Sequence, residues 1–388
     1  MMDDMFELMK GASDKETLEW LSADPKRMLY AELFIAELQA RKGGKRRTCD
    51  THRFEVNLYE NLSRLTDAIW NYQYKPSRGT AHIIFDPVQR EIFEAPYVDR
   101  VVHHFVVNSI IEWWERRFHS GSCSCRVGKG TAYGIKMLDH HIRSASENYK
   151  KEVFVVKMDI KGYFMHINRK ILWKKVSEGL DKQFAGNYNK RYFMLKHVCK
   201  EIIFDDPVDG VKLQGSIEDW RNLPHDKSLF CQLIGIGMVI GNLTSQFFSN
   251  IYLNNLDWFI ARDLGYKRYG RYVDDFYIVV SKEELPQAMR DVEVIENKLN
   301  VLGMNLNRKK TRVIPSWQGV PFLGMVVKHG RIVPNKRIEK NFALSARETV
   351  AGIRGPESVQ SYLGLLNNYN ADGLVKKVFK EVSWDFFE

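Results

Sequence analysis

Two adjacent aspartates inside an apolar run are the feature that most restricts how this chain can fold. Residues 271–280 read RYVDDFYIVV, and the stretch from Phe276 to Val280 suits a buried strand. Asp274 and Asp275 repel each other, and removing either carboxylate from water is costly unless a cation or a donor compensates it. An isolated pair at a solvated turn would be ordinary, because aspartate favours turns. We expect a hairpin with the pair at or near its turn.

A third acid, Asp159, is expected to lie near the aspartate pair. The strand-like segment KEVFVVKMD ends on Asp159 and is followed by IKGYF. On neighbouring strands of one sheet, this carboxylate and the hairpin pair would converge on one point. The sequence offers no obvious cationic partner beside them, so the cluster calls for a divalent metal. Oxygen ligands favour magnesium or manganese, and two metals about 4 Å apart suit in-line phosphoryl displacement.

The composition fits a folded protein with a polyanionic partner. The 388 residues are 44% hydrophobic and carry a net charge of +10, which favours nucleic acid as a partner. Two cation runs, RKGGKRRT from Arg41 to Thr48 and NRKKTR from Asn307 to Arg312, are candidate contacts or merely solvated faces. We expect no membrane span and no signal peptide, and the 5 irregularly spaced cysteines favour a reducing, cytoplasmic location.

The pattern along the chain mixes helices with short strands. We expect helices up to about residue 80, a strand pair and a long helix within 81–118, and helices within 170–204. Residues 205–230 are polar and predict a loop or insertion. A helix follows, capped by Thr244 or Ser245 and ended by Gly265. Another helix over 284–303, a short hairpin near residues 321–334 and a helical, basic C-terminal segment complete the prediction.

Seven segments resemble the motifs of reverse transcriptases, in that family's order, across residues 86–325. Tyr272–Asp275 matches the signature box, and VVKMDIKGYFMHI is similar to the palm motif with the first catalytic aspartate. The other segments are DPVQREIFEAPYVDRVVHH, CSCRVGKGTAYG, VIGNLTSQFFSNIYL, LNRKKT and FLG. The resemblance implies an α+β, right-hand polymerase fold. It would comprise an N-terminal helical extension (1–85), fingers with the start of the palm (86–155), an antiparallel palm with an insertion near 205–230 (156–325), and a helical thumb (326–388).

The resemblance also implies residue roles. Asp159, Asp274 and Asp275 would be catalytic and hold two Mg²⁺ ions, with Mn²⁺ as an alternative metal and the carbonyl of Ile160 as a further ligand. Phe164 matches the steric gate that selects deoxynucleotides. The other nucleotide-binding candidates are Arg90, Ile160, Gly162, Tyr163, Ile240, Gly241, Gln246 and Lys310, of which Lys310 matches the lysine that protonates pyrophosphate. The nucleic-acid-binding candidates are Arg41, Lys42, Lys45, Arg46, Arg47, Arg126, Lys336 and Arg337.

The segment IGNLTSQ, residues 240–246, points to a subfamily. Many reverse transcriptases carry glutamine before this glycine, whereas this chain has Ile240. Together with GKRRT and the short length, this resembles the reverse transcriptases of diversity-generating retroelements. That resemblance implies a template-repeat RNA copied with errors opposite adenines, an RNA/cDNA duplex, dNTPs, and a small basic helical accessory protein.

Three alternatives stay open. The chain also suits a group II intron-like or antiphage-defence bacterial reverse transcriptase. An inactive RNA-binding relative is a different class, although such a scaffold would not need all three acids. Ile240 itself can be read as core packing rather than as a nucleotide contact.

Overall fold

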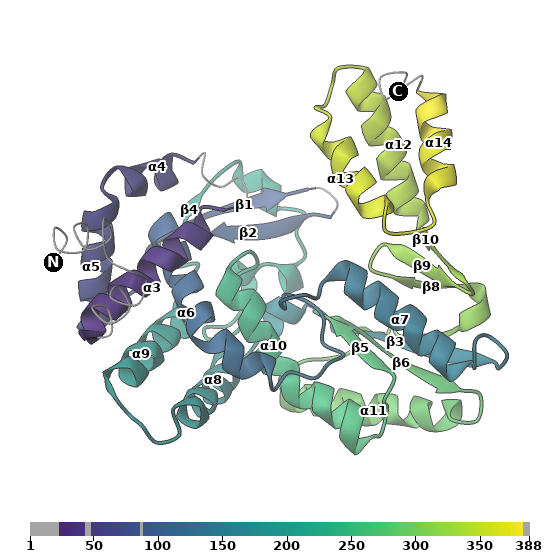
Figure 1. Cartoon of the computed structure of the whole chain (residues 1–388), viewed down its shortest axis with the longest axis horizontal. Helices are drawn as coiled ribbons and strands as arrows, with labels where there is room; N and C mark the ends of the chain where they lie inside the picture. The colour runs from purple at the N-terminus through teal and green to yellow at the C-terminus, as the bar shows by residue number, and fades with distance from the viewer. Residues whose placement is uncertain (1–22, 43–47, 86–87, 383–388) are drawn as a thin grey trace. The chain divides into compact units, whose positions relative to one another are not determined.

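The computed structural model describes residues 23–42, 48–85 and 88–382, and in them helices alternate with short strands that form three sheets (Figure 1). Contacts divide the chain into two compact units. The first comprises residues 1–118 and 162–254, and the second comprises residues 119–161 and 255–388. The division into fingers, palm and thumb stays a prediction. None of the described helices is long and apolar enough to cross a membrane.

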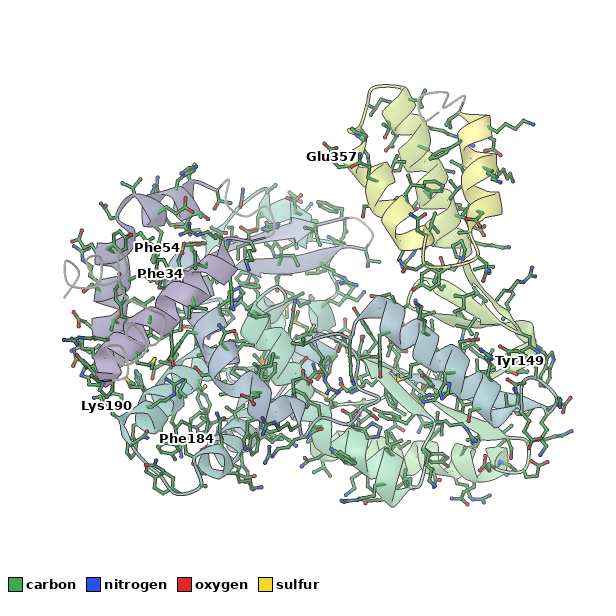
Figure 2. All side chains as sticks on the ribbon, viewed as in Figure 1. Phe34, Phe54, Tyr149, Phe184, Lys190 and Glu357 are labelled. Carbon is green, nitrogen blue, oxygen red and sulfur yellow. The ribbon has the colours of Figure 1, made fainter. Side chains whose placement is uncertain are left out.

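Among the described residues, the N-terminal part of the first unit is helical, as predicted, while residues 1–22 lie outside the described part of the chain. It contains α3 (Pro25–Ala40), α4 (Cys49–Val56) and α5 (Leu58–Trp70). Phe54, Leu62 and Ile69 are buried, and Asn57 separates α4 from α5. The ring of Phe54, labelled in Figure 2, packs edge-on against Tyr97 with centroids 5.3 Å apart.

The predicted strand pair and long helix follow. Strands β1 (Thr80–Ile84) and β2 (Arg90–Glu94) are antiparallel and lead into α6 (Tyr97–Glu115). Helices α8 (Arg169–Phe184) and α9 (Lys190–Phe204) confirm the helical prediction for 170–204.

Residues 205–230 are an ordered segment anchored on β2. Strand β4 (Lys212–Leu213) pairs in parallel with β1, and three short 3-10 turns follow: η3 (Ile217–Trp220), η4 (His225–Lys227) and η5 (Leu229–Cys231). The anchor is Glu91, which is 1% exposed. Its carboxylate accepts hydrogen bonds from Trp220 Nε1 (2.8 Å), Ser228 Oγ (2.8 Å) and the Leu229 amide (2.7 Å).

Helix α10 (Leu243–Trp258) begins earlier than predicted. Thr244 and Ser245 therefore lie inside its first turn rather than at its cap, and Thr244 Oγ1 hydrogen-bonds His103 Nδ1 at 2.8 Å instead. The predicted end is confirmed, because a π turn (Phe259–Asp263) leads to Gly265 in the left-handed region at φ 82°.

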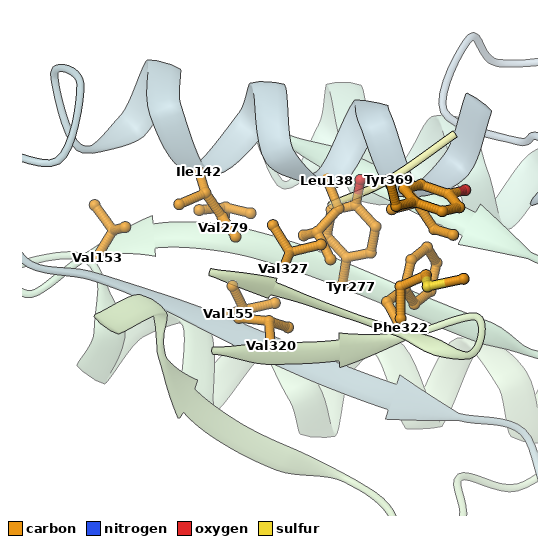
Figure 3. Packing of buried hydrophobic residues seen from close by; sticks show 12 residues of the cluster. Leu138, Ile142, Val153, Val155, Tyr277, Val279, Val320, Phe322, Val327 and Tyr369 are labelled. Atoms are coloured by element: carbon orange, nitrogen blue, oxygen red, sulfur yellow. The ribbon is translucent and has the colours of Figure 1, made fainter. Parts of the chain in front are cut away.

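An antiparallel sheet forms the centre of the second unit. Its strands lie in the order β5 (Tyr269–Tyr272), β6 (Asp275–Ser281), β3 (Val153–Asp159) and β7 (Arg312–Pro315). Helix α7 (Thr131–Ala145) covers one face, where Leu138 and Ile142 meet Val155, Tyr277 and Val279 (Figure 3). Helix α11 (Leu285–Val301) follows β6. Burying these branched and aromatic side chains holds β3 and β6 in a fixed register.

The remainder of the second unit is a small sheet and three helices. Strands β8 (Val320–Phe322), β9 (Met325–Lys328) and β10 (Arg331–Pro334) are antiparallel, which confirms a hairpin near 321–334. Helices α12 (Lys336–Val350), α13 (Glu357–Leu366) and α14 (Asp372–Glu381) form their own core around Phe342. The C-terminal segment is helical, as predicted.

Candidate active site

The hairpin predicted around the aspartate pair is present. Tyr272 pairs with Asp275, so Val273 and Asp274 form the two-residue turn between β5 and β6. Val273 has φ 57°, in the left-handed region. A β-branched residue is rare there, and the strain is worth about 1–3 kcal/mol. The surrounding structure must therefore hold the turn in place.

The third acid lies beside the pair. Asp159, at the end of β3, is the register partner of Asp275 on β6. Directly paired residues of an antiparallel sheet project to the same face. The amide of Ile160 donates to the carbonyl of Asp274 at 3.0 Å, and the carbonyl of Asp159 accepts from the amide of Asn307 at 2.7 Å. The backbone thus gathers the three carboxylates at one end of the sheet.

The electrostatics reflect this crowding. Burial, together with the negative charges of Asp159 and Asp275, raises the pKa of Asp274 to about 6. Burial also raises the pKa of Asp275, although the neighbouring Lys157 acts in the opposite direction. The ionised cluster is therefore unfavourable without added positive charge.

Two lysines supply positive charge, so the expectation of no cationic partner is wrong. Lys157 Nζ lies 3.0 Å from Asp275 Oδ2, and Lys310 Nζ lies 2.9 Å from Asp159 Oδ2. Burial lowers the pKa of Lys310, but its hydrogen bond to Asp159 and the nearby charges of the acids outweigh this and raise it. Lys157 was missed in the sequence, although strand alternation places it on the same face as Asp159, two residues later.

The chemistry of the donor set fits a divalent metal. Three carboxylates and a neighbouring backbone carbonyl are the hard oxygen ligands that magnesium and manganese prefer. As arranged, however, no three His, Cys, Asp or Glu side chains among the described residues are poised to hold an ion. Two of the three carboxylates bond to lysine, and we infer that the ammonium groups take the place of metal charge. A metal would have to compete with them.

The nucleotide-binding candidates near Phe164 lie in the first unit. Gly162 has φ 55°, and a Cβ there would lie 2.8 Å from the ring of His166, so both backbone and space require glycine. The 3-10 turn η2 (Tyr163–His166) follows. Tyr163 is buried and donates its hydroxyl hydrogen to the carbonyl of Ser249 at 2.6 Å. Tyr163 thereby fixes the turn that carries Phe164.

Ile240 lies on a loop tied to that turn. The Met238 amide donates to the carbonyl of Phe164 at 2.9 Å. The Ile240 side chain packs, partly buried, on a cluster that contains Phe93, Met165 and Leu229. Ile240 thus has a packing role, and its contact with a nucleotide stays a prediction.

The other candidates of the first unit lie near β2. Arg90 is exposed at the start of the strand. A cavity next to β2 is lined by Lys42, Arg100, Gly241 and Gln246, among other residues. The cavity therefore brings together the candidates Lys42, Gly241 and Gln246, although Lys42 is far from the other two in the sequence.

The predicted nucleic-acid contacts differ in their surroundings. Lys336 and Arg337 are exposed in the first turn of α12. Arg41 bonds the buried Glu37, with Nε to Oε1 at 2.9 Å, and Arg126 Nη1 donates to the carbonyl of Ser122 at 2.9 Å. Both guanidinium groups therefore have internal partners. Lys45, Arg46 and Arg47 lie outside the described residues.

Residues 94–327, more than half of the chain, match the family described as reverse transcriptase (RNA-dependent DNA polymerase). The chain belongs to this family of nucleotidyltransferases, which uses divalent metal ions. The predicted fold class, α+β with a right-hand polymerase fold, is confirmed.

No curated protein sequence matches the chain. Among solved structures it is similar to the telomerase of Candida tropicalis with the TWJ fragment of telomeric RNA, at 12% identity and a TM-score of 0.47, over 80% of this chain and 54% of that one. It is similar to the Candida albicans telomerase complex at 14% identity and a TM-score of 0.48, over 82% and 58%. The chain thus spans little more than half the length of these telomerases.

Proposed function

We propose that this chain copies a template-repeat RNA into cDNA by two-metal nucleotidyl transfer, as the reverse transcriptase of a diversity-generating retroelement. The observation that carries the polymerase chemistry is the pairing of Asp159 with Asp275 next to the turn that holds Asp274. Asp159, Asp274, Asp275 and the carbonyl of Ile160 would hold two Mg²⁺ ions. When bound, the ions lower the pKa of the primer 3′-hydroxyl and neutralise charge on the triphosphate.

The chain's own residues would orient and select the nucleotide. Phe164 would exclude a ribose 2′-hydroxyl by size. Arg90 would lie over the base and phosphates, since its planar cation suits both contacts. Lys310 has a raised pKa, so its amine holds a proton at neutral pH that it would give to the departing pyrophosphate.

The subfamily part of the proposal rests on Ile240. A glutamine before Gly241 would offer an amide to the incoming nucleotide, whereas isoleucine has no donor or acceptor and acts through shape alone. The small basic accessory protein and a structured template RNA would be partners. The candidate contacts for these partners are the cationic segment 41–47 and the exposed cations Lys336, Arg337, Lys340, Lys376, Lys377 and Lys380.

Primer extension tests the proposal. The full chain, supplied with a primed RNA template, dNTPs and Mg²⁺, should extend the primer, and Asp274→Ala should abolish extension. The matched control is Asp372→Ala, an exposed acid at the start of α14. Undiminished extension by Asp274→Ala contradicts the polymerase chemistry. Faithful copying of an adenine-rich RNA contradicts the subfamily and leaves a group II intron-like or antiphage-defence reverse transcriptase.

A further inference from the structure

The strained turn that carries Asp274 is held by a buried ion pair that none of the sequence motifs explains. Arg271 on β5 and Asp257 near the end of α10 are both 0% exposed. Their contact is bidentate, with Nε to Oδ1 at 2.7 Å and Nη2 to Oδ2 at 2.7 Å. Tyr269 also donates its hydroxyl hydrogen to Asp257 Oδ1 at 2.6 Å. The carboxylate is therefore fully compensated although it is out of water.

The same guanidinium reaches the turn. Arg271 Nη1 donates to the carbonyl of Val273 at 3.0 Å, and Nη2 also donates to Ser122 Oγ at 3.0 Å. Only arginine offers several donors in one rigid fork. A buried ion pair is weak evidence for a gain in stability, since apolar residues often do as well. Because Arg271 also donates to the Val273 carbonyl and to Ser122, we infer that the pair positions the turn rather than stabilising the fold.

The turn is also held by a serine. The amide of Val273 donates to Ser124 Oγ at 3.1 Å. Both backbone polar groups of Val273 are thus bonded, one to Ser124 and one to Arg271. Ser124 is 1% exposed, so no bulk water replaces its hydroxyl.

The loop that carries Ser124 is itself fastened to β5. The amide of Arg271 donates to the carbonyl of Gly121 at 2.8 Å, and the amide of Cys123 donates to the carbonyl of Arg271 at 3.0 Å. Arg126 Nη1 closes the loop by bonding the carbonyls of His119 (2.7 Å) and Ser122 (2.9 Å). The segment CSCR, of which Arg126 is a candidate nucleic-acid contact, packs against the aspartate hairpin.

We propose that Ser124 and Arg271 are positioning residues that fix the Val273–Asp274 turn, with Asp257 holding Arg271 in place. The inference rests on the proposed function, in which Asp274 binds a metal ion. A residue with φ 57° and a β-branched side chain tends to relax toward an extended conformation. Loss of either bond to Val273 would free that movement and carry Asp274 away from Asp159 and Asp275.

The test compares Ser124→Ala with Ser120→Ala, an exposed serine of the same loop. We measure Mn²⁺ binding by electron paramagnetic resonance, hydrogen exchange of residues 271–275, and the rate and primer KM of single-nucleotide extension. Ser124→Ala should raise the Mn²⁺ Kd, speed the exchange and lower the rate, each about tenfold, with an unchanged KM and melting temperature. Ser120→Ala should behave as wild type.

Arg271→Lys provides a second variant. It keeps a cation beside Asp257 but has one nitrogen in place of the fork, so it should weaken Mn²⁺ binding in the same direction. Asp274→Ala distinguishes a failure of the proposed function from a failure of the positioning role of Ser124 and Arg271. Retained Mn²⁺ binding and extension in Asp274→Ala refute the proposed function. If Asp274→Ala loses both but Ser124→Ala matches Ser120→Ala in Mn²⁺ binding and exchange, the positioning inference alone is wrong.

Discussion

Lys157 Nζ lies 3.0 Å from Asp275 Oδ2, and this ion pair occupies one edge of the carboxylate cluster. The lysine is about one-fifth exposed, so solvent only partly screens its charge. In the absence of metal it relieves repulsion among the acids. With a metal bound, the same charge repels the ion.

Lys157→Met should therefore strengthen metal binding but destabilise the metal-free protein. Mn²⁺ should bind about tenfold more tightly, because a competing cation is lost, and the metal-free protein should melt at a lower temperature. Electron paramagnetic resonance titration and thermal melts with and without Mn²⁺ measure both. Lys151→Met, an exposed lysine just before the same strand, is the control. Weaker Mn²⁺ binding by Lys157→Met would show that the lysine assists the metal instead.

His103 should make the stability of the protein depend on pH. Burial lowers the pKa of this histidine to about 3, assisted by the charges of His104 and Arg100. An unfolded chain has a histidine pKa of about 6.5, so between pH 6.5 and 3 the unfolded state binds more protons than the folded state. The free energy of unfolding should accordingly fall, by about 1.4 kcal/mol per pH unit, as the pH drops through this window.

His103→Gln should flatten that slope, because glutamine can still hydrogen-bond Thr244 but does not titrate. Urea denaturation at several pH values between 7 and 4.5 measures it, with His140→Gln, an exposed histidine on α7, as the comparison. Equal slopes in wild type and His103→Gln would mean that other groups govern the acid sensitivity.

Glu91 should anchor residues 205–230. Its carboxylate accepts three hydrogen bonds from that segment, so Glu91→Ala leaves buried donors unpaired and should cost about 2–4 kcal/mol. Limited proteolysis should then cut within 205–230 sooner than in wild type. Glu94→Ala, at the exposed other end of β2, should leave both stability and cleavage unchanged. Equal cleavage of the two variants would show that the segment is held by its apolar contacts alone.

Most helices and strands of this fold could be predicted from the sequence, because their apolar residues recur with a clear helical or strand periodicity. The apolar runs around Val155 and Val279 predicted buried strands, and the aspartate pair predicted the hairpin. What the sequence could not reveal is which charged residues become buried. Arg271 and Asp257 look like surface residues until the register of β5 is known. Lys157 reads as an ordinary strand residue until the pairing of β3 with β6 places it beside Asp275.

The start of α10 differs from the prediction because a tertiary contact, which the local sequence does not show, replaces the cap. Thr244 has the side chain of a cap, but the helix begins at Leu243 and the hydroxyl bonds His103, which is 141 residues away in the sequence. A tertiary contact outweighed a local preference. Residues 205–230, predicted to be a loop from their polarity, are ordered through Glu91, whose burial no local pattern indicates.

Substitutions at Ile240 test whether this residue sets the rate of misincorporation opposite adenine. The side chain packs on Phe93, Met165 and Leu229, and its loop is bonded to that of Phe164. Ile240→Gln would bring a donor and an acceptor to this place, whereas Ile240→Leu keeps the volume and adds no polar atom. If the residue acts on the nucleotide through its lack of polar groups, Ile240→Gln should lower misincorporation opposite adenine about tenfold, and Ile240→Leu should change it little.

Sequencing the cDNA made on an adenine-rich RNA measures the error spectrum, and thermal melts check that both variants fold. The packing alternative makes a different prediction. If Ile240 only fills the cluster, Ile240→Gln should lower the melting temperature by burying an amide, while errors opposite adenine stay at the wild-type level. An unchanged spectrum in a folded Ile240→Gln protein therefore assigns Ile240 to the core and places the source of errors elsewhere in the nucleotide site.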